Sequence, residues 1–242
     1  MFKLSKFLIS FLIITIIFID QLFAKENSAA VFLYHRFGEN KYPATNIKMS
    51  QFKKHINELK NNNYNIISID QIVDALINKT NIPKKSVAIT IDDAFLSIYK
   101  KAWPLLKEKK LPFTIFVSTA SVESGSKNYM SWKQIREMAA AGVIIGHHTR
   151  NHFHLVNKDK ETIINEIEKA NDDFLKNLGF VPDIFAYPYG EYTYEIKQIT
   201  KQYFKAAFGQ QSGNIYNQID IFELPRFSLN EHYGDLKRFK FA

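Results

Sequence analysis

The chain has 242 residues, no cysteine, and 32 basic against 24 acidic side chains, which gives a formal net charge of +8. The absence of cysteine excludes disulfide bonds and thiolate metal ligands, so any metal ion must be held by histidine and carboxylate groups. The charge could favour an anionic polymer or envelope surface, but lysine is spread through the chain beside abundant isoleucine and asparagine. Because the basic residues form no stripe with interleaved aromatic residues, we do not expect nucleic-acid binding.

The N-terminus has the pattern of a secretory signal peptide. Lys3 and Lys6 precede an apolar run of 13 residues, 7–19, and the small residue Ala24 stands where a signal peptidase would cut. The run is shorter than the ~18 residues that indicate a membrane-spanning helix, and an uncleaved anchor is the alternative. We therefore expect a signal peptide at 1–24 and one catalytic domain at 25–242. The protein would be periplasmic or extracellular without a stable membrane span, or membrane-attached if the N-terminal segment is retained.

Strand-like and helix-like segments alternate along the rest of the chain. Periodicity and turn residues predict strands at 29–34, 66–69, 86–91, 113–118, 143–146, 184–187, 206–208 and 222–224. They predict helices at 50–61, 71–77, 97–109, 132–141 and 161–178. Such alternation is typical of βαβ units with a parallel sheet, so we expect an α/β fold, a single distorted (β/α) barrel of about seven repeats. Catalytic groups of such barrels gather at the carboxyl ends of the strands.

Two pairs of side chains follow two of these strands. Asp92 and Asp93 end one apolar run, and His148 and His152 lie four residues apart after another. A catalytic Zn²⁺ site uses three imidazole or carboxylate ligands and leaves one position open. Two histidines and one aspartate meet that number, and the other aspartate can accept a proton from an activated water. A solvated acidic turn would explain the aspartates alone. All four residues together predict a mononuclear metal hydrolase using one divalent ion, Zn²⁺ or alternatively Co²⁺.

Three segments resemble motifs of the polysaccharide deacetylase family, the NodB-homology domain. They are residues 90–95 (TIDDAF), 146–152 (GHHTRNH) and 185–190 (FAYPYG). The resemblance extends over nearly all of residues 25–242 and is closest to the branch of biofilm poly-N-acetylglucosamine deacetylases. It implies that Asp92 is the general base and that Asp93, His148 and His152 bind the metal. It also implies that the backbone N–H of Tyr189 stabilises the oxyanion during hydrolysis of an N-acetyl or O-acetyl group.

The chain departs from the family pattern at two places. Many relatives carry an arginine shortly before the proline of the third motif, which orients the base, whereas this chain has Ala186 and Tyr187. Arg226, near the end of a late predicted strand, is a candidate substitute, with a surface or structural arginine as the alternative. No Leu-x-His motif supplies the general acid. We favour His35 over His232 for this role because His35 follows the first predicted strand and so lies at the catalytic rim.

Aromatic residues near the third motif are candidates for sugar contact. We expect Trp132, Tyr187, Tyr189 and Tyr192 to contact substrate, since flat rings beside a polar pocket suit a sugar ring. Pro188 is a further candidate for substrate binding. Ordinary packing is the alternative, above all for Trp132 at the start of a helix. His147 is expected to face away from the site if its strand continues that far.

The sequence therefore favours an exported, metal-dependent deacetylase of an N-acetylhexosamine polymer or oligomer of the cell envelope. A poly-N-acetylglucosamine-like exopolysaccharide is the first expectation, ahead of peptidoglycan and chitin-type oligomers. One alternative is a catalytically silent carbohydrate-binding module that keeps the barrel and the metal but lacks the acid and the arginine. Another is a deacylase of a lipid-linked sugar at the membrane. The sequence contains no signal for an oligomeric state.

Overall fold

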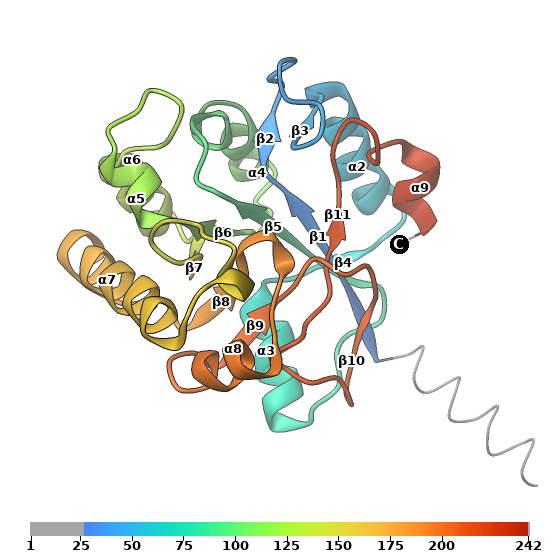
Figure 1. The fold of residues 1–242 in the computed structure, drawn as a ribbon. Helices are drawn as coiled ribbons and strands as arrows, with labels where there is room; N and C mark the ends of the chain where they lie inside the picture. The colour runs from blue at the N-terminus through green and yellow to red at the C-terminus, as the bar shows by residue number, and fades with distance from the viewer. Residues whose placement is uncertain (1–26, 242) are drawn as a thin grey trace, which may run out of the picture.

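The computed structural model describes residues 27–241, and the signal peptide predicted at 1–24 lies outside the described residues. Strands occupy the middle of the molecule and helices surround them (Figure 1). No helix within residues 27–241 is long and apolar enough to cross a membrane.

A curled sheet of nine strands forms the centre of the fold. Its strands are β1 (Ser28–Tyr34), β4 (Asn65–Ile66), β5 (Ser86–Asp92), β6 (Thr114–Val117), β7 (Ile144–His147), β8 (Ile184–Ala186), β9 (Ala206–Phe208), β10 (Ile215–Tyr216) and β11 (Phe227–Ser228). The order β10, β1, β5, β6, β7, β8, β9 runs across the sheet, with β11 paired to β1 and β4 to β5. All pairs are parallel except β10 with β1. The expected α/β fold with a distorted barrel is confirmed. Two short strands, β2 (Arg36–Phe37) and β3 (Asn46–Ile47), form a separate parallel pair.

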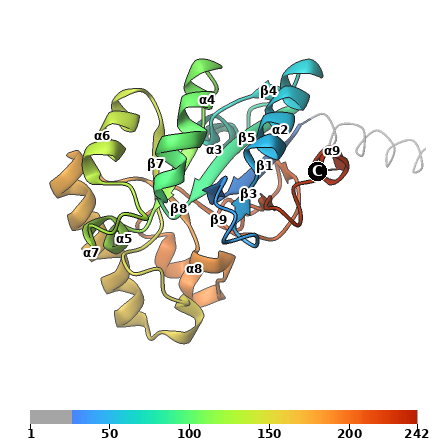
Figure 2. The same cartoon turned by 90° about the horizontal axis from the view of Figure 1, so that it is seen from above.

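The helices cover the outer face of the sheet. They are α2 (Met49–Asn61), α3 (Ile69–Asn78), α4 (Trp103–Glu108), α5 (Thr119–Glu123), α6 (Trp132–Ala140), α7 (Lys160–Leu178), α8 (Tyr194–Thr200) and α9 (Leu236–Phe241). In both views α5, α6 and α7 lie together on one side, and α2 and α9 lie on the other (Figures 1 and 2). The longest helix, α7, begins after Asp159, whose carboxylate accepts the Thr162 N–H at 2.7 Å, and it ends at Gly179 with φ 81°. A capping aspartate and a left-handed glycine account for these ends.

Three predicted elements differ from the structure. The strand predicted at 66–69 stops at Ile66, because Ser68 caps α3 by accepting the Gln71 N–H at 3.2 Å. The helix predicted at 97–109 begins as a π-helical turn, Ile98–Ala102, before α4. Pro104 explains this change, since its ring would clash with the carbonyl four residues earlier and it lacks an N–H.

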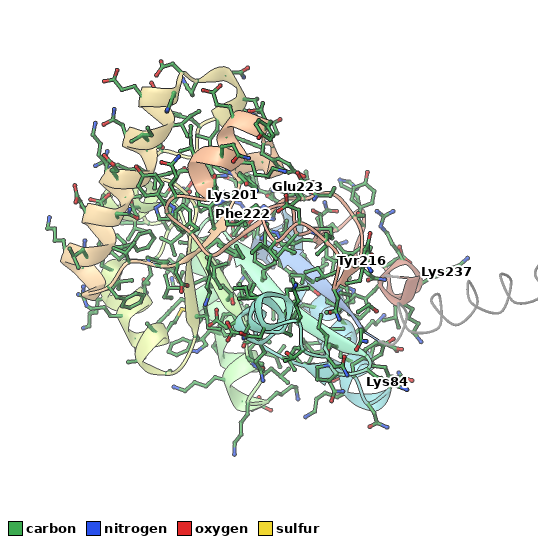
Figure 3. The ribbon with its side chains drawn as sticks, turned by 90° about the horizontal axis from the view of Figure 1, so that it is seen from below. Lys84, Lys201, Tyr216, Phe222, Glu223 and Lys237 are labelled. Carbon is green, nitrogen blue, oxygen red and sulfur yellow. The ribbon has the colours of Figure 1, made fainter. Side chains whose placement is uncertain are left out.

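The strand predicted at 222–224 is a turn with a single bridging residue. Phe222 N–H donates to the Asp220 carboxylate at 2.9 Å, which turns the chain before it can extend. Phe222 lies beside Lys201, whose ammonium is 5.4 Å from the ring centre, and Glu223 lies next to them (Figure 3). Only Leu224 pairs with the sheet, as a bridge to Phe208.

Alternation along β5 divides its side chains between two faces. Val87, Ile89 and Ile91 belong to the apolar layer that packs under the helices. Ala88 belongs to a second apolar cluster, and Thr90 and Asp92 share its side of the strand because residues two apart face the same way. Asp92 therefore points into the barrel at the carboxyl end of its strand.

The segment from Leu224 to Ser228 closes the barrel between the two ends of the parallel sheet. Leu224 bridges to Phe208 at the end of β9, and β11 pairs with β1 through Phe227 with Phe32. The chain crosses from one strand to the other over these few residues. Arg226 lies in this crossing and is fully buried.

Candidate active site

Asp92 and Arg226 form a buried ion pair at the centre of the barrel mouth. Both guanidinium Nη atoms donate to the Asp92 carboxylate, at 2.8 and 2.9 Å. Arg226 Nε donates to the Gly209 carbonyl at 2.9 Å, and its guanidinium lies 5.2 Å from the ring centre of Phe116. Burial raises the pKa of Asp92, but Arg226 and then His148 outweigh it and hold that pKa below its usual value. The arginine expected as a substitute for the missing motif residue thus contacts the expected base.

Asp93 lies beside Asp92 in a different environment. Its backbone has φ 75°, in the left-handed region, so the chain bends at the strand end and turns this carboxylate toward the same site. Among residues 27–241 its ion-pair contacts are His148 Nε2 at 3.6 Å and His152 Nε2 at 3.3 Å. Burial raises the pKa of Asp93 to about 6, against a smaller opposing effect of His35. The two aspartates are therefore unequal, and only Asp92 has a bidentate arginine.

Both histidines point a ring nitrogen, Nε2, toward Asp93. His148 Nδ1–H donates to the Ala186 carbonyl at 2.7 Å, which leaves Nε2 as the free acceptor. This Nε2 is buried and has no hydrogen-bond partner among the described residues. Burial lowers the pKa of His148 to about 3 and also lowers that of His152. Both rings are therefore neutral near pH 7, the state in which imidazole binds a metal.

These residues fit one divalent cation. One ligand atom from each of Asp93, His148 and His152 lies within 4.8 Å of the other two. His148 Nε2 has no hydrogen-bond partner among the described residues, and the Asp93 carboxylate forms no ion pair with an arginine or lysine of that range. Metal ligands have this pattern when the ion itself is not considered. Histidine and carboxylate ligands suit Zn²⁺, and three of them leave a position open for water or substrate. The structure brings together all three residues predicted as ligands.

A buried glutamate holds the loop between the two histidines. Glu166, on α7, is 4% exposed, and its carboxylate accepts the backbone N–H of Asn151 at 2.6 Å and the Asn151 side-chain amide at 2.5 Å. Asn151 precedes His152, which has φ 55°. A left-handed conformation at a non-glycine residue costs of order 1 kcal/mol, so it persists only where the surrounding contacts enforce it. Glu166 supplies two of those contacts.

The Pro188–Gly190 turn forms the wall opposite the aspartates. Tyr189 has φ 59°, and Gly190, with φ 72°, packs so closely on Gln210 that an added Cβ would lie 2.6 Å from the Gln210 backbone nitrogen. A glycine is therefore required there. The Tyr189 N–H forms no hydrogen bond with another of residues 27–241. It remains available as the oxyanion donor that the third motif implies.

A cavity of about 260 Å³ opens at this site. His35, Asp93, His152 and Tyr189 line it, together with residues of the closing segment near β11. His35 is half-buried and comes directly after β1, whereas the exposed His232 is not among the lining residues. This placement agrees with His35 as the candidate acid.

The structure contradicts one expected sugar contact, Tyr187, and does not place another, Trp132, among the residues that line the cavity. The Tyr187 ring is fully buried, and its hydroxyl donates to the Phe222 carbonyl at 3.1 Å. Trp132 packs edge-on against Phe174 of α7, on the helix side of the sheet, and donates to Glu123 at 2.5 Å. The Tyr187 ring therefore has a packing role, whereas Trp132 is half-buried and packs against the helix-side apolar cluster.

Of the remaining predicted residues, Pro188 and Tyr192 lie near the site, and His147 has the expected orientation. Pro188 is buried under the turn, and Tyr192 lines a second hollow next to the cavity. His147 faces away from the metal ligands, as expected, and packs among Phe174, Phe185 and Phe204.

Sequence reasoning missed three residues at or near the site, namely Glu166, Asp173 and Gln210. Glu166 lies on the apolar stripe predicted for α7, seven residues before Asp173, and a charged residue on such a stripe could have been recognised as a buried contact. The Asp173 carboxylate accepts hydrogen bonds from the Thr119 hydroxyl at 2.6 Å and from Arg150 Nε–H at 3.2 Å. Gln210 lies in an irregular segment and gave no signal in the sequence.

Comparisons with known proteins agree with this geometry. The sequence profile of the family described as polysaccharide deacetylase matches residues 79–206. That range contains both aspartates, both metal-ligand histidines and Tyr189, while His35 and Arg226 lie outside it. The chain is 27% identical over 236 residues to poly-beta-1,6-N-acetyl-D-glucosamine N-deacetylase of Staphylococcus aureus (strain MRSA252), covering 86% of this chain and 80% of that protein.

Solved structures show the same fold. The Streptococcus pyogenes deacetylase PplD in complex with acetate matches with a TM-score of 0.78 and 24% identity, over 85% of this chain and 94% of that one. The structure of IcaB from Ammonifex degensii matches with a TM-score of 0.75 and 26% identity, over 86% and 94% respectively.

Proposed function

This chain belongs to the polysaccharide deacetylase family, and from that premise we propose that it hydrolyses N-acetyl groups, or alternatively O-acetyl groups, on an N-acetylhexosamine polymer or oligomer. One divalent cation, Zn²⁺ or Co²⁺, would be the cofactor. Poly-β-1,6-N-acetylglucosamine is the first substrate to test, because the relative from Staphylococcus aureus is named for that polymer. The observation that supports the proposal most strongly is an arginine-paired buried carboxylate, Asp92, beside the ligand set of Asp93, His148 and His152.

The cation would be held by Asp93, His148 and His152. When bound, it would polarise the acetyl carbonyl and lower the pKa of a water molecule. Asp92 would accept the proton from that water, since its pairing with Arg226 keeps the carboxylate ionised at neutral pH. The base and the ligand are adjacent in sequence but have separate tasks.

Two further groups would act on the amide itself. The Tyr189 N–H would donate to the carbonyl oxygen as it becomes negative, and one such preorganised donor typically contributes ~3 kcal/mol. His35 would donate a proton to the nitrogen as the C–N bond breaks, because an amine leaves poorly without one. The products are acetate and a sugar amine.

These placements favour an enzyme over a silent carbohydrate-binding module. That alternative was expected to lack both the acid and the arginine, whereas Arg226 contacts Asp92 and His35 lines the cavity. We also propose export with cleavage after residue 24. N-terminal sequencing of the exported protein tests this point, and retention of the N-terminal segment would favour membrane attachment and a lipid-linked substrate.

Acetate release from acetylated glucosamine oligomers tests the function. The protein is loaded with Zn²⁺ or Co²⁺, and wild type is compared with Asp92→Asn and with a matched control, Asp172→Asn, at an exposed position of α7. We expect Asp92→Asn to lower kcat by about 100-fold or more and the control to leave it unchanged. Equal release by wild type and Asp92→Asn would remove Asp92 as the base. No release by wild type from any oligomer would overturn the deacetylase proposal in favour of a binding module.

A further inference from the structure

A second hollow adjoins the catalytic cavity. It has a volume of about 560 Å³ and shares two wall residues, Tyr189 and Gln210, with the cavity that contains Asp93. Because the two spaces meet along these side chains, a linear molecule seated in the first would extend over the second. A polymer substrate has neighbouring sugars on either side of the one that reacts, so the adjoining hollow lies where one of them would be.

The walls of this hollow have the composition of a sugar site. Tyr192 and Val156 offer apolar surface, and Gln210 and Gln211 offer amides that can donate and accept hydrogen bonds. The aromatic surface is fixed in position, since the Tyr192 ring stacks on the buried Tyr187 at 4.7 Å between ring centres. A rigid ring loses little conformational freedom when it contacts a ligand.

Tyr189 is the other rigid wall. Its ring stacks on His154 with 3.6 Å between ring centres and 4° between planes, and it contacts His152 edge-on at 4.5 Å. One side chain thus links the metal ligands to the second hollow. A ligand that occupies the hollow would touch the same ring that borders the reacting sugar.

One of the residues that line the hollow is charged. Glu191 is the one charged side chain among its lining residues, and that carboxylate is 42% exposed. Its contact within residues 27–241 is His154 Nδ1 at 2.8 Å, and no lysine or arginine of that range forms an ion pair with it. A protonated amine on a bound sugar would therefore meet an available carboxylate there, whereas an N-acetyl group would bring no charge.

We propose that this hollow binds the sugar next to the one being deacetylated and prefers glucosamine to N-acetylglucosamine, with Glu191 as the residue that sets the preference. The inference rests on the proposed deacetylase function. Hydrolysis leaves a free amine, which carries a positive charge below its own pKa, so each product residue would become the preferred neighbour for the next reaction. Deacetylation would then spread along a chain instead of striking isolated residues.

Tetrasaccharides of defined acetylation test this preference. The comparison uses the fully acetylated oligomer and two isomers that each contain a single glucosamine. In one isomer the glucosamine precedes the N-acetylglucosamine that reacts, and in the other it follows it. The measurement is kcat/KM for acetate release. We expect wild type to prefer one of the two isomers over the acetylated oligomer. Glu191→Gln should lower that ratio by about two- to five-fold, the range for a partly exposed ion pair. Glu195→Gln, at an exposed carboxylate on α8, is the matched control and should keep the ratio.

The outcomes separate this inference from the function on which it rests. Absence of acetate release by wild type from every tetrasaccharide would count against the deacetylase itself. Release without preference for either isomer, or a preference that Glu191→Gln leaves unchanged, would overturn the subsite while leaving the deacetylase in place. Tyr192→Ala provides a second measurement, with a raised KM for tetrasaccharide and a smaller change for a monosaccharide.

Discussion

Asp93, His148 and His152 are supplied by loops that follow the parallel strands β5 and β7, whereas Arg226 comes from the irregular segment that closes the barrel between β9 and β1. The first group depends on regular pairing of β5, β6 and β7 and is reinforced from the outside by α7. The second depends on a crossing that contains one bridge and one two-residue strand. The metal-ligand half and the closing half of the site thus have different structural support, and they should fail differently.

Removal of Arg226 should have the largest effect on the closing half. In Arg226→Met the Asp92 carboxylate would stay buried without its partner, and breaking a buried pair on one side typically costs ~3–5 kcal/mol. Without the guanidinium, burial would raise the pKa of Asp92, so a larger fraction of the base would be protonated at neutral pH. Urea unfolding and acetate release would both record the loss.

A double variant separates the two consequences. Arg226→Met with Asp92→Asn removes the uncompensated charge, so it should recover part of the stability and none of the activity. If Arg226→Met alone kept wild-type stability, the buried pair would have no structural role. If it kept wild-type activity, Arg226 would not be needed to hold the base ionised.

The sequence predicted the metal-ligand half better than the closing half for a physical reason. Asp92, Asp93, His148 and His152 each follow an apolar run, and carboxyl ends of neighbouring parallel strands meet at one edge. Local sequence pattern alone therefore predicted that these side chains lie close together. Their backbone bends were not predictable, since the positive φ values of Asp93 and His152 depend on contacts from β6 and α7.

The closing half depends on contacts between distant parts of the chain. The interaction of Arg226 with Asp92 spans 134 residues, and the strand next to Arg226 is only Phe227–Ser228. A two-residue strand has no periodicity to detect. The sequence therefore predicted a strand at 222–224 and none at Phe227–Ser228. Arg226 was identified as a candidate from its residue type, but the crossing that places it could not be derived from local pattern.

Substitution of His35 should distinguish the acid from the metal ligands. His35→Asn should lower acetate release from acetylated oligomers by about 10²- to 10⁴-fold, the usual contribution of a general acid. Hydrolysis of an aryl acetate should change little, because its leaving group needs no proton. The matched control His232→Asn, at an exposed position, should leave both rates unchanged. Equal losses on the amide and the ester would contradict the role of His35 as an acid, and a selective loss in His232→Asn would transfer it.

Acid should weaken the attachment of the C-terminal segment to α2 through His55. Its Nδ1 accepts from the Tyr34 hydroxyl at 3.0 Å, and its Nε2–H donates to the Gly234 carbonyl at 2.8 Å, so α2 is tied to the C-terminal segment. Burial lowers the pKa of His55 to about 4, while the unfolded chain titrates near 6.5. The unfolded state therefore binds more protons between these values, and stability is fully present above pH ~6.5 and falls toward pH 4.

The full loss, reached below pH 4, is about 3 kcal/mol for His55 alone, and about 2 kcal/mol of it falls between pH 7 and pH 4.5. Urea unfolding at pH 7 and pH 4.5 measures it, with His55→Gln as the variant that cannot titrate. The variant should show a shallower pH dependence than wild type. His147, whose pKa is lowered to about 3 by burial, keeps its own contribution in both proteins. Identical pH dependence of the two proteins would show that His55 titrates alike in both states.

The smallest expected effect lies in the metal-ligand half, at Glu166. In Glu166→Gln the new amide would place a donor against the Asn151 side-chain donor, so one of two contacts that hold the loop before His152 would be lost. A group bonded directly to a metal ligand typically changes metal affinity by ~10- to 100-fold. Because Glu166 acts through Asn151, we expect a loss at the lower end of that range, and competition of Zn²⁺ or Co²⁺ with a chelator measures it. Asp172→Asn on the same helix is the control. Adding Asn151→Asp restores an acceptor for the glutamine amide and keeps the net charge, so the double variant should regain affinity. If it does not, Glu166 acts through its charge instead of through the shape it gives the loop.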